Sequence, residues 1–457
     1  ASLRLLWRTN PDPNCVKTAQ AVPVVADEAS PLVANGAVYV ADVCGVVSAL
    51  NRDTGSLIWQ RSLPVSSGVA GVWGTPMLAD GRLFIPVWGT TTTSGATGGY
   101  LAALDAMSGA TLWMTQPLAH GNMRGEPLVV NGRVFQGISG GDLDTGYVSG
   151  GVAAFDEGSG QPIPNAFSVV PSCTLGTPCL GGASWSPISY DGQKLYFGTG
   201  NTKGAQTYQD SVLALEPSTL TLSVQVGGAT TYDGASEDED VGGGQLIWGG
   251  NLYFEGKNGN YYGYSLLTPN GPPFIHTKVN GNIVPGNGAI WTPTTDGSVI
   301  AVSSGYNTCA TGNGCFNMDL DLFPVGGGSK TCSFTESNPE LFSYAAFVKG
   351  IGFAALDNDI PAGGASAAPT FIAFDDGCHI LWQASPTDLL GYFYAGPAVV
   401  PSGVYAVDNL GDVYSWKLPS MVGASVLRRT AGLIRPGRFQ HILSGHFVPA
   451  RFGPHHY

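Results

Sequence analysis

A short sequence unit recurs along the chain, and this repeat constrains the fold more than any other feature. The unit contains Ala, an apolar residue, an Asp, Asn or Glu, a few turn residues and then an apolar run that often ends in Trp. The acid or amide is expected to cap a tight turn between antiparallel strands, in which Gly adopts a positive φ. The copies are ALNRDTGSLIW (49–59), ALDAMSGATLW (103–113), AFDEGSGQPIP (154–164), ALEPSTLTLSV (214–224) and AFDDGCHILW (373–382).

A second hairpin is expected upstream of these units. Two apolar runs flank Asn-Gly or Asp-Gly, dipeptides that predict two-residue turns. The segments are PLVANGAVYVAD (31–42), PMLADGRLFIPV (76–87), PLVVNGRVFQGI (127–138) and PISYDGQKLYFG (187–198). Two successive hairpins make one four-stranded sheet, and repetition of such sheets is typical of a β-propeller.

The spacing predicts an all-β fold, an eight-bladed β-propeller over residues 1–418 with four-stranded antiparallel blades. The last blade lacks an outer strand, which LRLLWRT (3–9) is predicted to supply, closing the ring. Trp59, Trp113 and Trp382 are expected to pack between neighbouring blades. Residues 419–457 contain five arginines and no acid and are treated as a separate basic tail. The blades are expected near 31–62, 74–116, 125–168, 183–226, 240–278, 287–335, 340–384 and 394–418.

The eight cysteines indicate an oxidising compartment. Cys173 with Cys179, and Cys309 with Cys315, bracket turn residues and are expected to form small disulfide loops. The remaining bridges are predicted as Cys15–Cys44 and Cys332–Cys378, with free buried cysteines as the alternative. No CxxC zinc pattern or haem attachment motif occurs.

Charge and apolar content narrow the classes of partner and the location. The formal charge of −13 argues against non-specific nucleic-acid binding, which needs a basic surface. No apolar run approaches the roughly 20 residues of a membrane helix. The start at Ala1 without Met predicts a mature secreted protein, extracellular or periplasmic. The oligomeric state is left open.

Several ordered segments resemble those of quinoprotein alcohol dehydrogenases, most of all their polyvinyl alcohol dehydrogenase-like branch. The Trp-ending repeat resembles the tryptophan-docking motif of that family. The resemblance covers residues 1–418 and implies an eight-bladed propeller that binds pyrroloquinoline quinone (PQQ) and calcium near its axis. The segments resembling the fourth, fifth and sixth blades are GGASWSPISYDGQKLYFGTGN (181–201), DEDVGGG (238–244) with EGKNGNYYGYSL (255–266), and GAIWTPTTDGSVIAVSSG (288–305).

The resemblance implies a calcium site and a catalytic base. Asn201 falls on a calcium-ligating Asn, and Asp142 falls where the family has a ligating Glu. Asp238 or Asp240 falls on the catalytic Asp, which also approaches calcium, and the EDED run leaves the choice open. Carboxylate and amide oxygens are the ligands that calcium prefers, and a carboxylate can take the proton of a substrate hydroxyl.

The same resemblance implies residues that bind the quinone. Trp185 falls on the indole that stacks against the quinone ring, and stacking supports a flat cofactor. Lys257 falls on the catalytic basic residue that contacts the quinone oxygens, where it would stabilise developing charge. Arg124 is placed among the cofactor-binding residues.

The implied function is oxidation of an alcohol, sugar or polyol by hydride transfer to PQQ. The chain departs from the family in lacking adjacent cysteines and in having Asp142 in place of Glu. It also lacks a haem segment, so electrons would pass to a separate acceptor. The alternative is a non-catalytic propeller that acts as an extracellular binding, scaffold or assembly protein, in which Asn201 and Lys257 are only turn residues.

Overall fold

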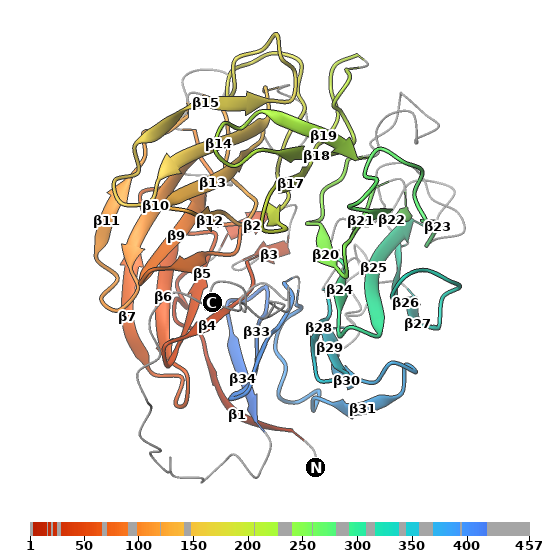
Figure 1. Cartoon of the computed structure of the whole chain (residues 1–457). Helices are drawn as coiled ribbons and strands as arrows, with labels where there is room; N and C mark the ends of the chain where they lie inside the picture. Colours follow the sequence, from red (N-terminus) through yellow and green to blue (C-terminus); the bar gives the residue numbers. More distant parts are fainter. Residues whose placement is uncertain are drawn as a thin grey trace, which may run out of the picture.

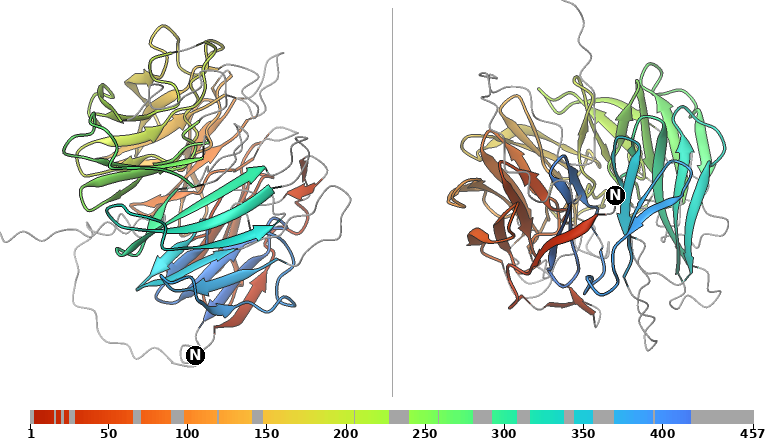
Figure 2. Two further views of the ribbon diagram at one scale, coloured as in Figure 1. Left: turned by 90° about the vertical axis from the view of Figure 1, so that its right-hand side faces the viewer. Right: turned by 90° about the horizontal axis from the view of Figure 1, so that it is seen from below.

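The structure is an eight-bladed β-propeller, as predicted: eight four-stranded antiparallel sheets stand side by side around a ring (Figures 1 and 2). No helix occurs among the residues that the structure describes. The computed structural model describes residues 3–15, 17–19, 22–24, 29–65, 71–89, 98–118, 120–140, 148–204, 206–226, 240–257, 259–279, 292–307, 316–337, 344–355, 369–393 and 395–417.

Blades one to four follow the chain from the inside of the ring outward. Blade one is β4 (Leu32–Ala34), β5 (Ala37–Ala41), β6 (Val46–Asn51) and β7 (Leu57–Ser62). Blade two is β8 (Met77–Ala79), β9 (Arg82–Val87), β10 (Tyr100–Asp105) and β11 (Thr111–Met114). Blade three is β12 (Leu128–Val130), β13 (Arg133–Ile138), β14 (Gly151–Asp156) and β15 (Pro162–Ser168). Blade four is β16 (Ser189–Tyr190), β17 (Leu195–Gly198), β18 (Val212–Leu215) and β19 (Leu222–Val226).

Blades five to eight continue this order. Blade five is β20 (Leu246–Trp248), β21 (Asn251–Glu255), β22 (Asn260–Ser265) and β23 (Ile275–Lys278). Blade six is β24 (Thr294–Thr295), β25 (Val299–Asn307), β26 (Phe316–Pro324) and β27 (Cys332–Ser337). Blade seven is β28 (Ala346–Val348), β29 (Ile351–Ala355), β30 (Phe371–Phe374) and β31 (Ile380–Gln383). Blade eight is β32 (Ala398–Val400), β33 (Gly403–Val407), β34 (Val413–Lys417) and β1 (Arg4–Thr9), and a separate hairpin pairs β2 (Lys17–Ala19) with β3 (Val22–Val24).

The N-terminal strand closes the ring, as the sequence predicted. β1 pairs antiparallel with β34, from Arg4 opposite Lys417 to Thr9 opposite Val413, and Figure 1 shows the red and blue strands side by side. Because the first and last parts of the chain share one blade, the ring has no open side between blades eight and one.

Outer-strand tryptophans of blades one and two lock each of these blades to the next one. Trp59 Nε1 donates to the Ala106 carbonyl at 3.0 Å. Its ring packs so closely on Gly109 that a methyl group there would lie 2.5 Å from the indole. Trp113 packs on Gly160 of the third blade in the same way. The predicted packing of these tryptophans between blades is confirmed.

The same lock operates at the ring closure. Trp382 Nε1 donates to the Leu3 carbonyl at 3.0 Å, which ties blade seven to β1. Trp7 in β1 then donates to the Arg52 carbonyl at 3.1 Å and packs against Gly55 of blade one. The N-terminal segment therefore supplies both the missing strand and its docking tryptophan.

The predicted Asn-Gly and Asp-Gly turns are confirmed in blades one to three. Both residues of these turns have positive φ, for example 51° at Asn131 and 74° at Gly132, as a two-residue hairpin turn requires. Blade four differs, because residues 191–194 separate β16 from β17. Asp191 Oδ1 there accepts from the backbone amides of Gln193 and Lys194, both at 2.7 Å, which stabilises a longer turn. The prediction of a two-residue turn was wrong at this position.

Three of the four predicted disulfides are present: Cys15–Cys44, Cys173–Cys179 and Cys332–Cys378. Cys309, Cys315 and the tail 419–457 lie outside the described residues, so their predictions stay untested.

Candidate functional site

Strand direction explains why the candidate residues gather at one end of the propeller. The first strands of neighbouring blades contact one another, for example β16 with β20 and β28 with β32, so they line the axis. In each blade the second strand runs antiparallel to the first, so the first begins where the second ends. We call the face on which the first strands begin and the second strands end the upper face.

All described candidate residues occupy these two kinds of position. Arg124, Trp185 and Asp240 precede the first strands of blades three, four and five. Asn201 follows β17 and Lys257 follows β21, the second strands of blades four and five. The topology alone therefore brings residues that are far apart in the sequence to the upper face.

Asp240 and Lys257 form a buried ion pair. Lys257 Nζ lies 3.1 Å from Asp240 Oδ2, and the exposed fractions of the two side chains are 17% and 2%. The backbone holds the pair in register, because the Lys257 amide donates to the Asp240 carbonyl at 2.9 Å. Asp240 Oδ1 accepts from the backbone amide of Asn201 at 2.7 Å. One carboxylate thus links blade five to the end of β17.

The Asn201 side chain lies between two carboxylates. If its amide nitrogen faces them, it donates to Asp210 Oδ1 at 2.8 Å and to Asp240 Oδ1 at 3.2 Å. If the amide turns over about its last bond, an oxygen takes that place and three oxygens converge. Asp210 is 4% exposed, and its other oxygen accepts from Gln209 Nε2 at 3.1 Å. This donor set has the chemistry of a hard-cation site.

Two cations approach the half-buried Trp185 ring. The Arg124 guanidinium carbon lies 5.3 Å from the ring centre and Lys257 Nζ lies 5.4 Å from it. Both distances fall within the range of cation–π attraction. An aromatic surface beside two positive charges suits a flat anionic ligand.

Two glycines make room for these side chains. A methyl group at Gly200 would lie 2.6 Å from Asp240 Oδ1, so GTGN brings the chain close enough to hold this carboxylate. A methyl group at Gly242 would lie 1.9 Å from the Trp185 ring. Gly200 of FGTGN and Gly242 of DVGGG are therefore required by contacts between the fourth and fifth blades.

The sequence reasoning missed three residues of this region. Asp210 precedes β18, and Trp73 and Trp88 flank the first two strands of blade two. The Arg124 guanidinium carbon lies 5.7 Å from the Trp73 ring centre and 5.4 Å from that of Trp88. Their positions along the blade could have indicated Trp73 and Trp88. Trp73 precedes the first strand of blade two and Trp88 follows the second, as the other candidate residues do in their blades. Asp142 and Asp238 lie outside the described residues.

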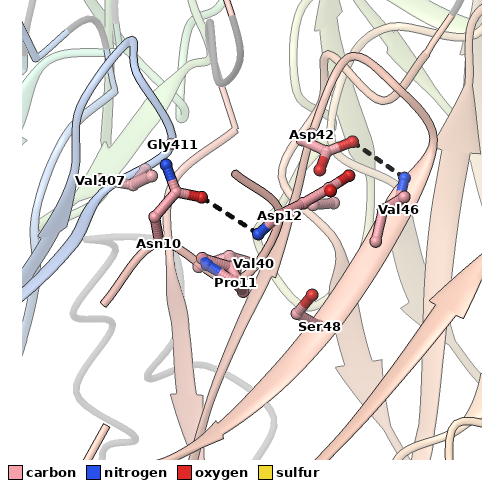
Figure 3. Close-up of a pocket in the computed structure, with 10 residues that line it drawn as sticks. Asn10, Pro11, Asp12, Val40, Asp42, Val46, Ser48, Val407 and Gly411 are labelled. Carbon is pink, nitrogen blue, oxygen red and sulfur yellow. Dashed lines mark hydrogen bonds between the residues drawn. The ribbon is translucent and has the colours of Figure 1, made fainter. Parts of the chain in front are cut away.

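A separate pocket lies at the seam between blades eight and one (Figure 3). Its polar groups stabilise local turns: Asn10 Oδ1 accepts from the Asp12 amide at 3.1 Å and Asp42 Oδ1 from the Val46 amide at 2.9 Å. None of the candidate site residues lines it. The lining residues are Asn10, Pro11, Asp12, Val40, Ala41, Asp42, Val46, Ser48, Val407 and Gly411.

Glu255, two residues before Lys257, is buried at the interface between blades five and six. It is 0% exposed, and neither carboxylate oxygen accepts a hydrogen bond in the described part of the chain. Burial raises the pKa of Glu255 well above its usual value, and the buried Asp321 carboxylate raises that pKa further. The nearby backbone of Ser303 lowers the pKa to a smaller extent.

Replacing Glu255 with Gln is expected to weaken the pH dependence of folding. Above pH 4.5, the ordinary pKa, the unfolded chain releases a proton that folded Glu255 retains. Stability therefore falls as pH rises toward the folded pKa, by at most about 1.4 kcal/mol per pH unit. Urea unfolding across pH should show a smaller decline in Glu255→Gln than in the wild type. The partly exposed Glu216→Gln is the control, and equal declines in all three proteins would contradict the expectation.

Comparison with known proteins places the chain in a family. A family model described as "Outer membrane protein assembly factor BamB", PQQ_2, matches residues 43–306. The chain belongs to the PQQ_2 family. Its curated relatives are quinoprotein dehydrogenases. Quinohemoprotein alcohol dehydrogenase ADH IIB of Pseudomonas putida is 28% identical over 236 residues, and the corresponding enzyme of Comamonas testosteroni is 26% identical over 229 residues.

The matches to these two relatives cover 43% and 42% of the PQQ_2 chain but only 33% and 32% of the relatives' own length. The resemblance to quinoprotein alcohol dehydrogenases is thus shown, while the polyvinyl alcohol dehydrogenase-like branch stays a prediction.

Among the described residues, no helix has the length and apolar character that crossing a membrane requires.

Solved structures show the same fold. ADHIIG from Pseudomonas putida superimposes with a TM-score of 0.68 at 17% identity, over 95% of this chain and 78% of that chain. BamB from Moraxella catarrhalis superimposes with a TM-score of 0.60 at 16% identity, over 92% of this chain and 98% of that chain. The PQQ_2 propeller thus shares its fold both with dehydrogenases and with an assembly factor.

Proposed function

We propose that this protein is a secreted or periplasmic dehydrogenase that uses PQQ and calcium to oxidise an alcohol, sugar or polyol. The convergence of Asn201, Asp240 and Lys257 beside Trp185 carries the proposal. These residues come from separate positions in two blades and meet on the upper face. The similarity to quinoprotein alcohol dehydrogenases and the disulfides of an oxidising compartment support it.

The residues present fit both implied groups. Asn201, Asp240 and Asp210 offer the all-oxygen donor set that calcium prefers, and the first two would ligate it with Asp210 as a third candidate. The Trp185 ring would support the quinone, with Arg124 and Lys257 beside it to neutralise its carboxylates and oxygens. Asp142 and Asp238 remain proposed ligands, and Asp238 a proposed alternative base.

Bound PQQ would accept a hydride, and bound calcium would polarise the quinone carbonyl. Asp240 is the proposed base, which would take the proton of the substrate hydroxyl as the hydride leaves carbon. Lys257 orients this carboxylate through its contact with Asp240 Oδ2. It would also stabilise negative charge on the oxygens of a quinone stacked on the Trp185 ring. The low exposure of the Asp240 side chain, 2%, limits the access of water to its carboxylate. A separate acceptor would then take the electrons.

Reconstitution tests the proposal. Purified protein is titrated with PQQ in the presence and absence of Ca²⁺, and tryptophan fluorescence and quinone absorbance are recorded. Saturable, calcium-dependent binding followed by dye reduction with a panel of alcohols, sugars and polyols is the expected result. If PQQ does not bind at any calcium concentration, the proposal of a PQQ-dependent dehydrogenase is wrong.

A non-catalytic assembly or scaffold protein is the second candidate. The observation that favours it is coverage: the chain spans 98% of the BamB structure, and the matching family model carries the BamB description. This candidate predicts a stable propeller that binds no PQQ, so the same titration separates the two functions.

A further inference from the structure

Three tryptophan rings surround one guanidinium group on the upper face. The Arg124 guanidinium carbon lies 5.3 Å from the ring centre of Trp185, 5.4 Å from that of Trp88 and 5.7 Å from that of Trp73. Trp73 and Trp88 lie against each other, with ring centres 5.7 Å apart. The flat cation therefore contacts an aromatic surface of blade two and the indole of blade four at once.

The pair of indoles in blade two is firmly held. Trp73 and Trp88 are 8% and 3% exposed and pack in one buried cluster with the Cys15–Cys44 disulfide. Trp88 also exchanges two backbone hydrogen bonds with Gly71, at 2.8 and 3.0 Å. Such support fixes the orientation of both rings before any ligand arrives.

Trp88 has a buried polar group without a described partner. Its Nε1 is buried and donates to no described residue. Buried indole N–H groups usually find an acceptor. A bound molecule with carbonyl or carboxylate oxygens would supply such an acceptor.

The guanidinium indicates the shape and charge of that ligand. A guanidinium is planar, stacks on aromatic faces and pairs with carboxylates through two parallel hydrogen bonds. Space that accommodates it between indoles also accommodates a flat aromatic ring, and the arginine favours an anionic one. PQQ, a planar quinone with carboxylates, has both properties.

We propose that Trp73 and Trp88 form the second aromatic wall of the cofactor slot, whose first wall is Trp185. Arg124, whose guanidinium carbon lies 5.3 to 5.7 Å from the three ring centres, would pair with a cofactor carboxylate when PQQ is bound. This inference deepens the proposed function and rests on it. It also assigns the Cys15–Cys44 disulfide a role as the support of the second wall.

The test is PQQ affinity, measured by fluorescence titration with Ca²⁺ present. Loss of one stacking wall in Trp73→Ala is expected to weaken binding about tenfold or more, and Trp185→Ala should do the same. Trp73→Phe keeps an aromatic face and should stay within about threefold of the wild type. Trp248→Ala is the matched control, because Trp248 ends the first strand of blade five on the opposite face. Near-ultraviolet circular dichroism checks that each variant is folded.

The outcomes separate the inference from the function on which it rests. Weakened binding in both Trp73→Ala and Trp185→Ala, with Trp248→Ala unchanged, supports the slot. Normal binding by Trp73→Ala and weak binding by Trp185→Ala overturns the second wall and leaves the proposed function standing. Absence of binding by the wild type overturns both. If Trp73→Ala does not fold, Trp88→Phe replaces it: the loss of its N–H should weaken binding, and an unchanged affinity contradicts the inference.

Discussion

Replacing Asp240 with Asn is expected to lower kcat/KM for alcohol oxidation by the reconstituted protein by about 10²- to 10⁴-fold. The amide keeps the size of the side chain but cannot accept the substrate proton at neutral pH. Dye reduction at several alcohol concentrations measures the loss. Asp240 is also a proposed calcium ligand, so the affinities of each protein for PQQ and Ca²⁺ are measured as well. The rates of the variant and the wild type are then compared at saturating PQQ and Ca²⁺.

Two further variants separate chemistry from folding in this experiment. The Asp240–Lys257 pair is buried, so removal of one partner costs up to about 3–5 kcal/mol of stability. Lys257→Gln should therefore destabilise the fold about as much as Asp240→Asn while leaving a carboxylate base in place. Asp376→Asn makes the same chemical change at an exposed turn and should leave activity and stability unchanged. Full activity in a well-folded Asp240→Asn protein would exclude Asp240 as the base. Asp238 would then be the remaining proposed base.

The fold could be predicted because its determinants are local. The Asn35-Gly36 and Asn131-Gly132 turns need only their own residues to adopt positive φ, and they do so as expected. The blade-four turn at Asp191 escaped prediction because its length depends on a side chain that caps two later amides, and the dipeptide does not reveal this. Ring closure was predictable because LRLLWRT carries both a strand pattern and a docking tryptophan.

The candidate site was predictable only in part, because its contacts join separate blades. Asn201, Trp185 and Lys257 were found through resemblance, and position at the strand ends explains their common face. Asp210 has no neighbouring motif, and its closeness to Asn201 follows from the path of the chain between β17 and β18. Trp73 and Trp88 look like ordinary core residues in the sequence. Only their distance to Arg124, a residue of another blade, distinguishes them.

Replacing Gly160 with Ala is expected to destabilise the propeller far more than replacing Gly132 with Ala. Both glycines lie in turns of blade three with similar φ, 69° and 74°, so each substitution carries a backbone cost of about 1–2 kcal/mol. A methyl group at Gly132 meets nothing within 4 Å, whereas one at Gly160 would lie 2.4 Å from the Trp113 ring. Overpacking of that kind adds about 1–3 kcal/mol.

The difference between the two variants therefore measures the tryptophan lock between blades two and three. Equilibrium urea unfolding gives the free energy of each, and the wild-type slope should be retained in both if the native fold persists. Trp113→Phe in the Gly160→Ala background should recover part of the loss, because the smaller ring leaves room for the methyl group while keeping contact with Phe84. Equal stabilities of Gly160→Ala and Gly132→Ala would contradict the lock, and the repeated glycine would then serve only the turn that contains it.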